Sequence, residues 1–193
     1  MIAYIKGQFT YKSPTHVIME SHGLGYHVNI SLNTYEKVQS LDHGLLHIHF
    51  HVKEDAHTLY GFFSEGERRM FQHLISVSGV GPNTARMMLS SMEPIEIQQA
   101  IVLENVKLLQ SIKGIGPKSA QRIILELKDK VSRENLPTAK GASGDNSNME
   151  DALSALSALG ISRPLAQRAL SKAVKELNSG TVEGLVKTAL KLL

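Results

Sequence analysis

The sequence predicts an α+β chain built from several separate parts, and three observations support that prediction. Residues 1–64 contain short alternating runs of apolar residues broken by Gly and Pro, which is typical of a small closed β-barrel. Residues 65–136 follow a helical pattern that includes a repeated glycine motif. A stretch without large apolar residues, 137–147, then separates these parts from three short helices in residues 148–193.

The first 64 residues favour an OB-like barrel of about five short strands. Tyr26, Val28 and Ile30 alternate with polar neighbours, as expected of a strand with one buried face. The run from Leu32 to Leu41 favours a brief helix between strands.

Three histidines lie in one predicted strand of this barrel, at His47, His49 and His51. Because side chains alternate along a strand, the imidazoles share one face and the apolar neighbours share the other. Such a row could ligate zinc in a metal-dependent nuclease, which stays open as an alternative. No carboxylate accompanies the row in an obvious position, so we expect a solvent-exposed strand face and no metal site.

The helical segment contains one glycine motif twice, at Ser78–Pro82 and Lys113–Pro117, with an offset of 35 residues. The similarity extends outward in register. The matched pairs are Leu74 with Leu109, Ser76 with Ser111, Val77 with Ile112, Thr84 with Ser119, and Ala85 with Ala120.

Each motif is expected to form a helix, a tight hairpin and a second helix. Glycine reaches positive φ without a Cβ penalty, and proline suits the first turn of a helix. The residue between the glycines, Val80 or Ile115, can turn inward as an anchor. The five helices expected in this segment are Glu65–Val77, Pro82–Met92, Pro94–Leu103, Val106–Ile112 and Pro117–Ser132. Ser64 is the expected N-cap of the first, with Glu67 at capping-box spacing.

Such a hairpin presents backbone N–H groups beside a helix N-terminus, an arrangement that attracts phosphate. Backbone donors read phosphate and not base identity, so the motif resembles the helix-hairpin-helix element of proteins that bind DNA without sequence preference. A single copy could equally be an ordinary helix–helix turn. The candidate DNA-binding residues are Gly79, Val80, Gly81, Asn83 and Thr84 in the first copy, and Gly114, Ile115, Gly116, Lys118, Ser119 and Arg122 in the second.

The charge distribution agrees with a phosphate-binding surface in this segment. Residues 65–142 carry eleven Lys or Arg against eight Asp or Glu, whereas the first 64 residues carry four against five. The chain has no Cys, so it has no disulfide and no thiolate nucleophile. Lys118-Ser119 does not complete a Walker loop, because Pro117 occupies the position of its last glycine. We expect no catalytic site, no cofactor, no membrane segment and a cytoplasmic location.

Residues 137–147 are expected to be a flexible linker with a reach on the order of 15–20 Å. Beyond it, Asn148, Ser162 and Thr181 are the expected N-caps of three helices, and Gly160 ends the first of them. The last segment resembles three-helix domains of the ubiquitin-associated type, which favours a docking module over a catalytic unit. A simple solubility appendage is the alternative.

Two adjacent acids, Glu54 and Asp55, follow the histidine strand at a predicted turn. In a protein that binds DNA they would repel phosphate. The segment from Val52 to Phe62, together with the barrel, the two hairpins and the three-helix domain, resembles the RuvA family of proteins that bind Holliday junctions. The resemblance covers essentially the whole chain.

The resemblance implies a non-catalytic subunit that binds four-way junction DNA and holds it open and square-planar in recombination and repair. It implies a homotetramer with fourfold symmetry, or an octamer on DNA, in which the Glu54-Asp55 loops meet as acidic pins. It further implies contact between the C-terminal domain and the RuvB motor ATPase, and assembly with the RuvC resolvase. Asn83 is a departure, because many relatives have Lys there. The candidate docking residues, which the sequence does not separate from core residues, are Leu153, Leu156, Leu159, Leu165 and Leu170. A DNA-tethering scaffold without junction preference remains an alternative.

Overall fold

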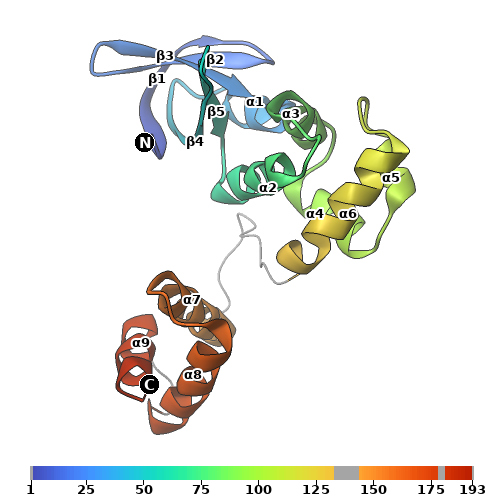
Figure 1. Ribbon diagram of the computed structural model, residues 1–193. Helices are drawn as coiled ribbons and strands as arrows, with labels where there is room; N and C mark the ends of the chain where they lie inside the picture. The colour runs from blue at the N-terminus through green and yellow to red at the C-terminus, as the bar shows by residue number, and fades with distance from the viewer. Residues whose placement is uncertain (1, 133–143, 178–180, 193) are drawn as a thin grey trace. The chain divides into compact units, whose positions relative to one another are not determined.

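The computed structural model describes residues 2–132, 144–177 and 181–192 (Figure 1). The chain divides into two compact units, Met1–Ala139 and Lys140–Leu193, and each is described by itself. Most of the predicted linker, residues 137–143, lies outside the described residues.

The first part of the larger unit is a closed five-stranded barrel, as the sequence predicts. The strands are joined in the order β1-β2-β3-β5-β4, with β3 and β5 parallel and the other pairs antiparallel. The short predicted helix, α1 (Leu32–Val38), follows the third strand. The strands are β1 (Tyr4–Lys12), β2 (His16–Ser21), β3 (Leu24–Ile30), β4 (His43–Val52) and β5 (His57–Phe62).

The barrel closes around inward-facing apolar side chains that alternate with outward-facing ones. Val17 and Met19 of β2 are fully buried, and their neighbours in the strand are not. This period of two is what the sequence pattern predicts for strands with one face on a core. The buried residues of this core are Ile5, Phe9, Val17, Met19, Val28, Ile30, Val38, Leu46 and Ile48.

The second part of the larger unit is a layer of helices that repeats one arrangement. The pairs α2–α3 and α5–α6 each enclose a glycine hairpin, and α4 connects them (Figure 1). Each helix begins at the predicted residue and ends one or two residues earlier than predicted. The helices are α2 (Glu65–Ser76), α3 (Pro82–Ser91), α4 (Pro94–Val102), α5 (Val106–Gln110) and α6 (Pro117–Val131).

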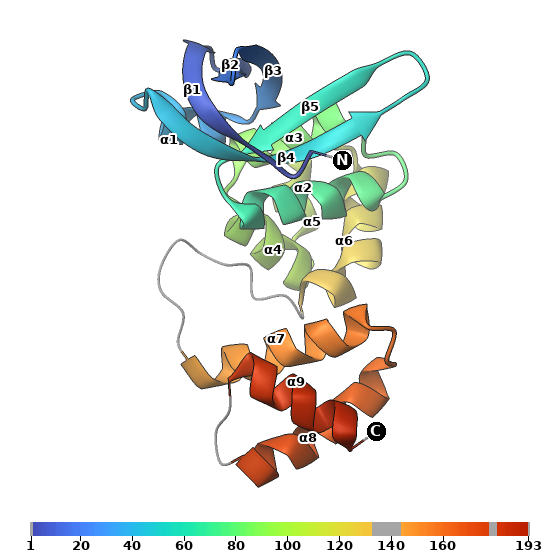
Figure 2. The ribbon, with the colours of Figure 1, turned by 90° about the vertical axis from the view of Figure 1, so that its left-hand side faces the viewer.

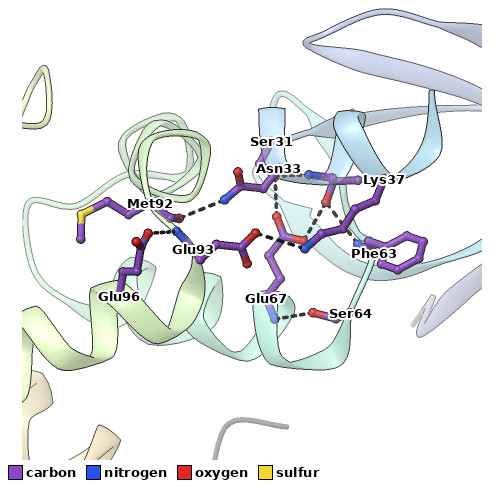
Figure 3. A network of polar contacts seen from close by, with 10 residues as sticks. Ser31, Asn33, Lys37, Phe63, Ser64, Glu67, Met92, Glu93 and Glu96 are labelled. Atoms are coloured by element: carbon purple, nitrogen blue, oxygen red, sulfur yellow. Dashed lines mark hydrogen bonds and ion pairs between the residues drawn. The ribbon is translucent and has the colours of Figure 1, made fainter. Parts of the chain in front are cut away.

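A buried carboxylate joins this helical layer to the barrel (Figure 3). Glu67 accepts hydrogen bonds from Ser31 Oγ and, at 2.7 Å, from Thr34 Oγ1, both at the start of α1. The Phe63 N–H in turn donates to Thr34 Oγ1 at 3.1 Å. Burial raises the pKa of Glu67, and the two hydroxyl donors oppose that rise.

The same contacts correct one detail of the predicted start of α2. Ser64 is the N-cap, as predicted, and its hydroxyl accepts from the Glu67 N–H at 3.2 Å. The Glu67 side chain, however, does not turn back to complete a capping box. It reaches α1 instead, because α1 offers two hydroxyl donors that would otherwise be buried without an acceptor.

Two arginines of the first helix pair hold α2 and α3 against the barrel. Arg68 Nη1 donates to the carbonyls of Ala3 and Ile48 at 3.3 and 3.2 Å. Arg86 Nη1 donates at 3.1 Å to the Thr15 carbonyl, and a bond of the same length runs to Asn29 Oδ1. These contacts place α2 and α3 next to the barrel, with α5 and α6 on the far side of the helical layer (Figure 1).

The smaller unit is a bundle of three helices, as predicted: α7 (Gly144–Ala158), α8 (Arg163–Leu177) and α9 (Val182–Lys191). Helix α7 starts at Gly144, so the predicted start at Asn148 and the predicted end of the linker at 147 are wrong. Backbone hydrogen bonds, not apolar side chains, define a helix, so the absence of apolar residues did not mark its first turn. Gly160, at φ 86°, ends α7 as predicted.

Candidate nucleic-acid interface

The two glycine hairpins have nearly the same backbone conformation. The first glycine of each, Gly79 or Gly114, lies at positive φ, 89° and 93° respectively. The second glycine, Gly81 or Gly116, is the N-cap of the following helix with φ −84° or −85°. The prediction that glycine permits the reversal is therefore confirmed for the first glycine of each pair.

The residue between the glycines points inward in both hairpins, as predicted. Val80 and Ile115 are both buried, with 5% of each exposed. Each donates its N–H to the carbonyl three residues back, Val80 to Val77 at 3.0 Å and Ile115 to Ile112 at 3.1 Å. The buried anchor and this bond hold the turn closed, so that the glycines lie at the surface.

A second repeated contact shows how far the duplication extends. Ser76 Oγ donates to the His73 carbonyl at 2.7 Å, and Ser111 Oγ donates to the Leu108 carbonyl at the same distance. Both hydroxyls therefore bond one turn back at the end of the helix that precedes the hairpin. The register predicted from sequence corresponds to equivalent positions in space.

The helix that follows each hairpin begins with free space at its N-terminus. Neither Gly81 nor Gly116 provides a side-chain cap, and proline occupies the first turn of α3 and α6. A Cβ at either glycine would meet no atom of the described protein within 4 Å. Since φ there is ordinary, the protein's own fold does not require glycine at these two positions, whereas close approach of an outside group would.

The side chains around the two hairpins differ in charge. Lys118 follows the second hairpin, is exposed and makes no ion pair with the described residues. Its counterpart in the first hairpin is Asn83, which is also exposed. Thr84 and Ser119 occupy equivalent, partly buried positions one residue later.

Arg122 connects the two hairpins. It lies on α6, after the second hairpin, yet its Nη1 donates to the carbonyl of Ser78 in the first hairpin at 3.3 Å. Its Nε lies 3.6 Å from Glu126 Oε1, one turn further along α6. No local pattern predicts this contact, because the two residues are 44 positions apart in the chain.

The acidic pair lies at the tip of the β4–β5 hairpin, which projects from the barrel (Figure 2). Glu54 and Asp55 are exposed, and the Lys53 N–H donates to the Ala56 carbonyl at 2.9 Å to close the turn. Their carboxylates make no ion pair with the described residues. The loop therefore presents two negative charges away from the barrel core.

The histidine strand is not the solvent-exposed face that we expected from the sequence. His47 Nδ1 lies 3.2 Å from Glu65 Oε2 at the start of α2, and the His49 ring lies 5.3 Å from the ring of Phe71. The imidazoles do share one face of β4, but α2 packs against His47 and His49 on that face, so the three residues are only partly exposed. Burial lowers the pKa of His49, and the neighbouring His51 lowers it further.

The packing of α2 on β4 also bears on the zinc alternative. Among the residues that the structure describes, no group of three or more His, Cys, Asp or Glu side chains could hold a metal ion. The strand periodicity correctly placed the imidazoles together, but it did not reveal which element packs on them.

The structure separates the core leucines of the C-terminal bundle from the exposed ones. Leu156 and Leu170 are fully buried, and Leu153 is partly buried against the same core. Leu159 and Leu165 are 63% and 49% exposed. Of the five predicted docking residues, only these last two present substantial apolar surface.

Family models match three successive parts of the chain. The RuvA N terminal domain matches residues 1–61, the SAM-like Helix-hairpin-helix tandem matches residues 71–129, and the RuvA C-terminal domain matches residues 147–193. Within the described ranges, no helix is long and apolar enough to cross a membrane.

Curated relatives match over full length. A protein of Christiangramia forsetii is 49% identical over 193 residues, one of Cytophaga hutchinsonii is 46% identical over 198, and one of Bacteroides fragilis is 43% identical over 201. In all three pairs the match covers the whole of both chains, and each relative is named as a Holliday junction branch migration complex subunit RuvA. The barrel, the paired hairpins and these full-length matches together show that the chain belongs to the RuvA family.

Proposed function

We propose that this protein binds Holliday junctions by their shape and phosphate backbone, without reading base sequence, and holds the crossover open for branch migration. The observation that carries the proposal is the pair of equivalent hairpins in one helical layer, each with an open second glycine at a helix N-terminus. Two such sites on one subunit suit two phosphates of a duplex arm.

Gly81 and Gly116 are the proposed points of closest approach to phosphate. Both glycines leave free space where a Cβ would lie, and each stands beside first-turn N–H groups that receive no side-chain cap. A phosphate oxygen can therefore approach the backbone and accept from those groups. Gly79 and Gly114 shape the turns, Val80 and Ile115 anchor them, and Lys118 adds charge at the second site.

The acidic loop favours a junction over a plain duplex. Glu54 and Asp55 carry negative charge at the tip of a projecting hairpin of the same compact unit that holds the glycine hairpins. On linear DNA this loop would only repel the backbone. At a crossover, where four arms diverge, repulsion from the centre would keep the strands apart while the hairpins hold the arms.

The proposed assembly is a homotetramer with fourfold symmetry, or an octamer on DNA, with the barrel of residues 1–64 at its centre. Residues 65–136 would bind the arms, and residues 148–193 would contact the RuvB motor through Leu159 and Leu165. In this scheme the chain is a non-catalytic subunit in the cytoplasm, RuvB hydrolyses ATP, and RuvC joins the complex as the resolvase.

The test compares a synthetic four-way junction with a linear duplex of the same arm sequence. We expect much tighter binding to the junction and little dependence on arm sequence, because the contacts are to phosphate. Equal affinity for the two DNAs would refute junction recognition and leave only a general tethering function. The mass of the particle with and without junction DNA distinguishes tetramer from octamer.

A variant with Glu54→Gln and Asp55→Asn tests the acidic loop. Junction affinity should stay the same or rise, because repulsion is removed, while the rate of branch migration with the motor should change. A large loss of affinity would contradict the proposed role of the loop. Lys53→Gln in the same turn is the matched control, because it also changes the charge of the loop but keeps Glu54 and Asp55.

A further inference from the structure

One hydrogen bond runs between the two hairpins and joins a cation of the second to the backbone of the first. Arg122 Nη1 donates to the Ser78 carbonyl at 3.3 Å, and Ser78 immediately precedes the first glycine, Gly79. The Arg122 side chain remains 54% exposed, so it is not enclosed by the contact. The guanidinium thus lies beside the first hairpin at Ser78, although Arg122 follows the second hairpin in the sequence.

Among the described residues, the first hairpin and the opening turn of α3 contain no cation that is directed toward the glycines. Its opening turn contains Asn83 and Thr84, and Met87 takes the position equivalent to Arg122. Arg86 of the same helix is directed toward the barrel, where its Nη1 donates to the Thr15 carbonyl and to Asn29. The second hairpin, in contrast, has Lys113 and Lys118 exposed around its glycines.

We propose that Arg122 serves the first hairpin and not the second, supplying the positive charge that the first hairpin's own sequence lacks. The inference rests on the proposed function, since it assigns one residue to one of the two proposed phosphate sites. Arg122 therefore belongs to α6 but acts at the turn between α2 and α3.

The geometry gives two ways for Arg122 to strengthen that site. Its guanidinium has five N–H donors, and the contact to Ser78 uses one of them, which leaves others for a phosphate. The Ser78 carbonyl also belongs to the same peptide group as the Gly79 N–H. A charged donor on the carbonyl polarises that peptide and makes the Gly79 N–H a better donor.

Glu126 holds the arginine in this orientation. Its Oε1 lies 3.6 Å from Arg122 Nε, so the ion pair does not involve Nη1, which contacts Ser78. An i,i+4 pair of this kind on a helix surface is weak by itself. Here it restricts the rotamers of a long side chain, so that less entropy is lost when the contact with a phosphate forms.

A double-mutant cycle on junction binding tests the assignment. Arg122→Ala is combined separately with Gly81→Ala, which would obstruct the first site, and with Gly116→Ala, the matched change at the second site. Both glycine changes meet free space and ordinary φ in the protein, so both variants should fold. Circular dichroism and thermal melting of each variant check that expectation.

The wild-type chain should bind the junction about tenfold more tightly than Arg122→Ala. The slope of the logarithm of its binding constant against the logarithm of salt concentration should be steeper by about one. If Arg122 serves the first site, Arg122→Ala should reduce junction affinity much less in the Gly81→Ala background than in the Gly116→Ala background. The reason is that Gly81→Ala already blocks the first site. Equal losses in both backgrounds, or a smaller loss in the Gly116→Ala background, would overturn the assignment.

Rescue provides an independent readout. Asn83→Lys adds a cation to the first hairpin and should restore most of the affinity that Arg122→Ala loses, but little of the affinity that Lys118→Ala loses. Equal rescue of both variants would also overturn the assignment. A wild-type chain that shows no junction preference would instead refute the proposed function, which makes the two failures distinguishable.

Discussion

The two hairpins of this protein have nearly the same backbone conformation, but their charged side chains make different contacts. In the first, the charged residues of the flanking helices are used to hold the domain together: Glu67 binds α1, while Arg68 and Arg86 bind the barrel. In the second, Lys113 and Lys118 stay exposed. The comparison shows that a positive φ and a buried anchor suffice for the turn, which leaves the remaining positions free to diverge.

The largest expected effect comes from the shared anchors. Ile115→Ala should lower the free energy of unfolding by about 2–5 kcal/mol, because it empties a buried site. Val80→Ala should cost less, since it removes fewer methyl groups from an equally buried position. Chemical denaturation followed by circular dichroism measures both.

The exposed Leu125 provides a control for these two substitutions. It is 84% exposed on α6, so Leu125→Ala should change stability by no more than about 0.5 kcal/mol. A larger loss for Val80→Ala than for Ile115→Ala would show that the two hairpins are not mechanically equivalent.

The attachment of the first hairpin to the barrel can be broken at Glu67. Glu67→Ala leaves the hydroxyls of Ser31 and Thr34 without their buried acceptor and should cost about 1–3 kcal/mol. Hydrogen exchange should accelerate in α2 and α3 more than in α5 and α6. Equal acceleration in all four helices would contradict the view that only the first hairpin is fixed by the barrel.

The same residue should give a pH dependence. Burial raises the folded-state pKa of Glu67 above its unfolded value, so the Glu67 carboxylate binds a proton more tightly in the folded protein than in the unfolded chain. The resulting stability is fully present below the unfolded pKa and is lost as the pH rises through the folded pKa. Glu67→Gln should flatten this part of the stability profile, and an unchanged profile would contradict the role of Glu67.

The turns themselves should respond alike to loss of glycine. Gly79→Ala and Gly114→Ala place a Cβ at positive φ, and each should cost about 1–2 kcal/mol. Gly81→Ala and Gly116→Ala should cost only a few tenths of a kcal/mol, on the order of the differences among weak N-caps. Thermal melting of the four variants compares them, and a cost at Gly81 equal to that at Gly79 would go against the assigned geometry.

The smallest expected effects concern the charge difference between the two hairpins, at the equivalent positions Lys118 and Asn83. Lys118→Ala should weaken junction binding several-fold. It should also make the slope of the logarithm of the binding constant against the logarithm of salt concentration shallower by about one. Asn83→Ala, at the equivalent position, should leave the salt dependence unchanged because no charge is lost. Binding titrations at several salt concentrations measure both, and equal slopes for the two variants would remove the predicted asymmetry.

Much of this protein could be predicted from local patterns. The alternation around Val28 and Ile30 indicated a strand with a buried face, and Ser64 indicated the start of α2. The repeated glycines indicated both turns, including the inward anchors Val80 and Ile115. Such features depend on backbone conformation and period within a few residues, so neighbouring residues carry the information.

The contacts between segments could not be predicted in this way. The periodicity of β4 put His47, His49 and His51 on one face, but only the packing of α2 shows that this face is covered. Glu67 had the spacing of a capping box and instead binds α1, and Arg122 binds a hairpin 44 residues away. Apolar residues in the C-terminal bundle likewise divide into buried Leu156 and exposed Leu159 only once the helices pack.

The barrel, the two hairpins, most helix starts and the resemblance to the RuvA family could be read from the amino-acid sequence, because each depends on short-range backbone preferences or on motifs of fixed spacing. Packing showed which charged side chains hold the fold together and which remain exposed to solvent. That division depends on which donors and acceptors meet when distant segments pack, and a buried polar group takes the partner that lies closest in space.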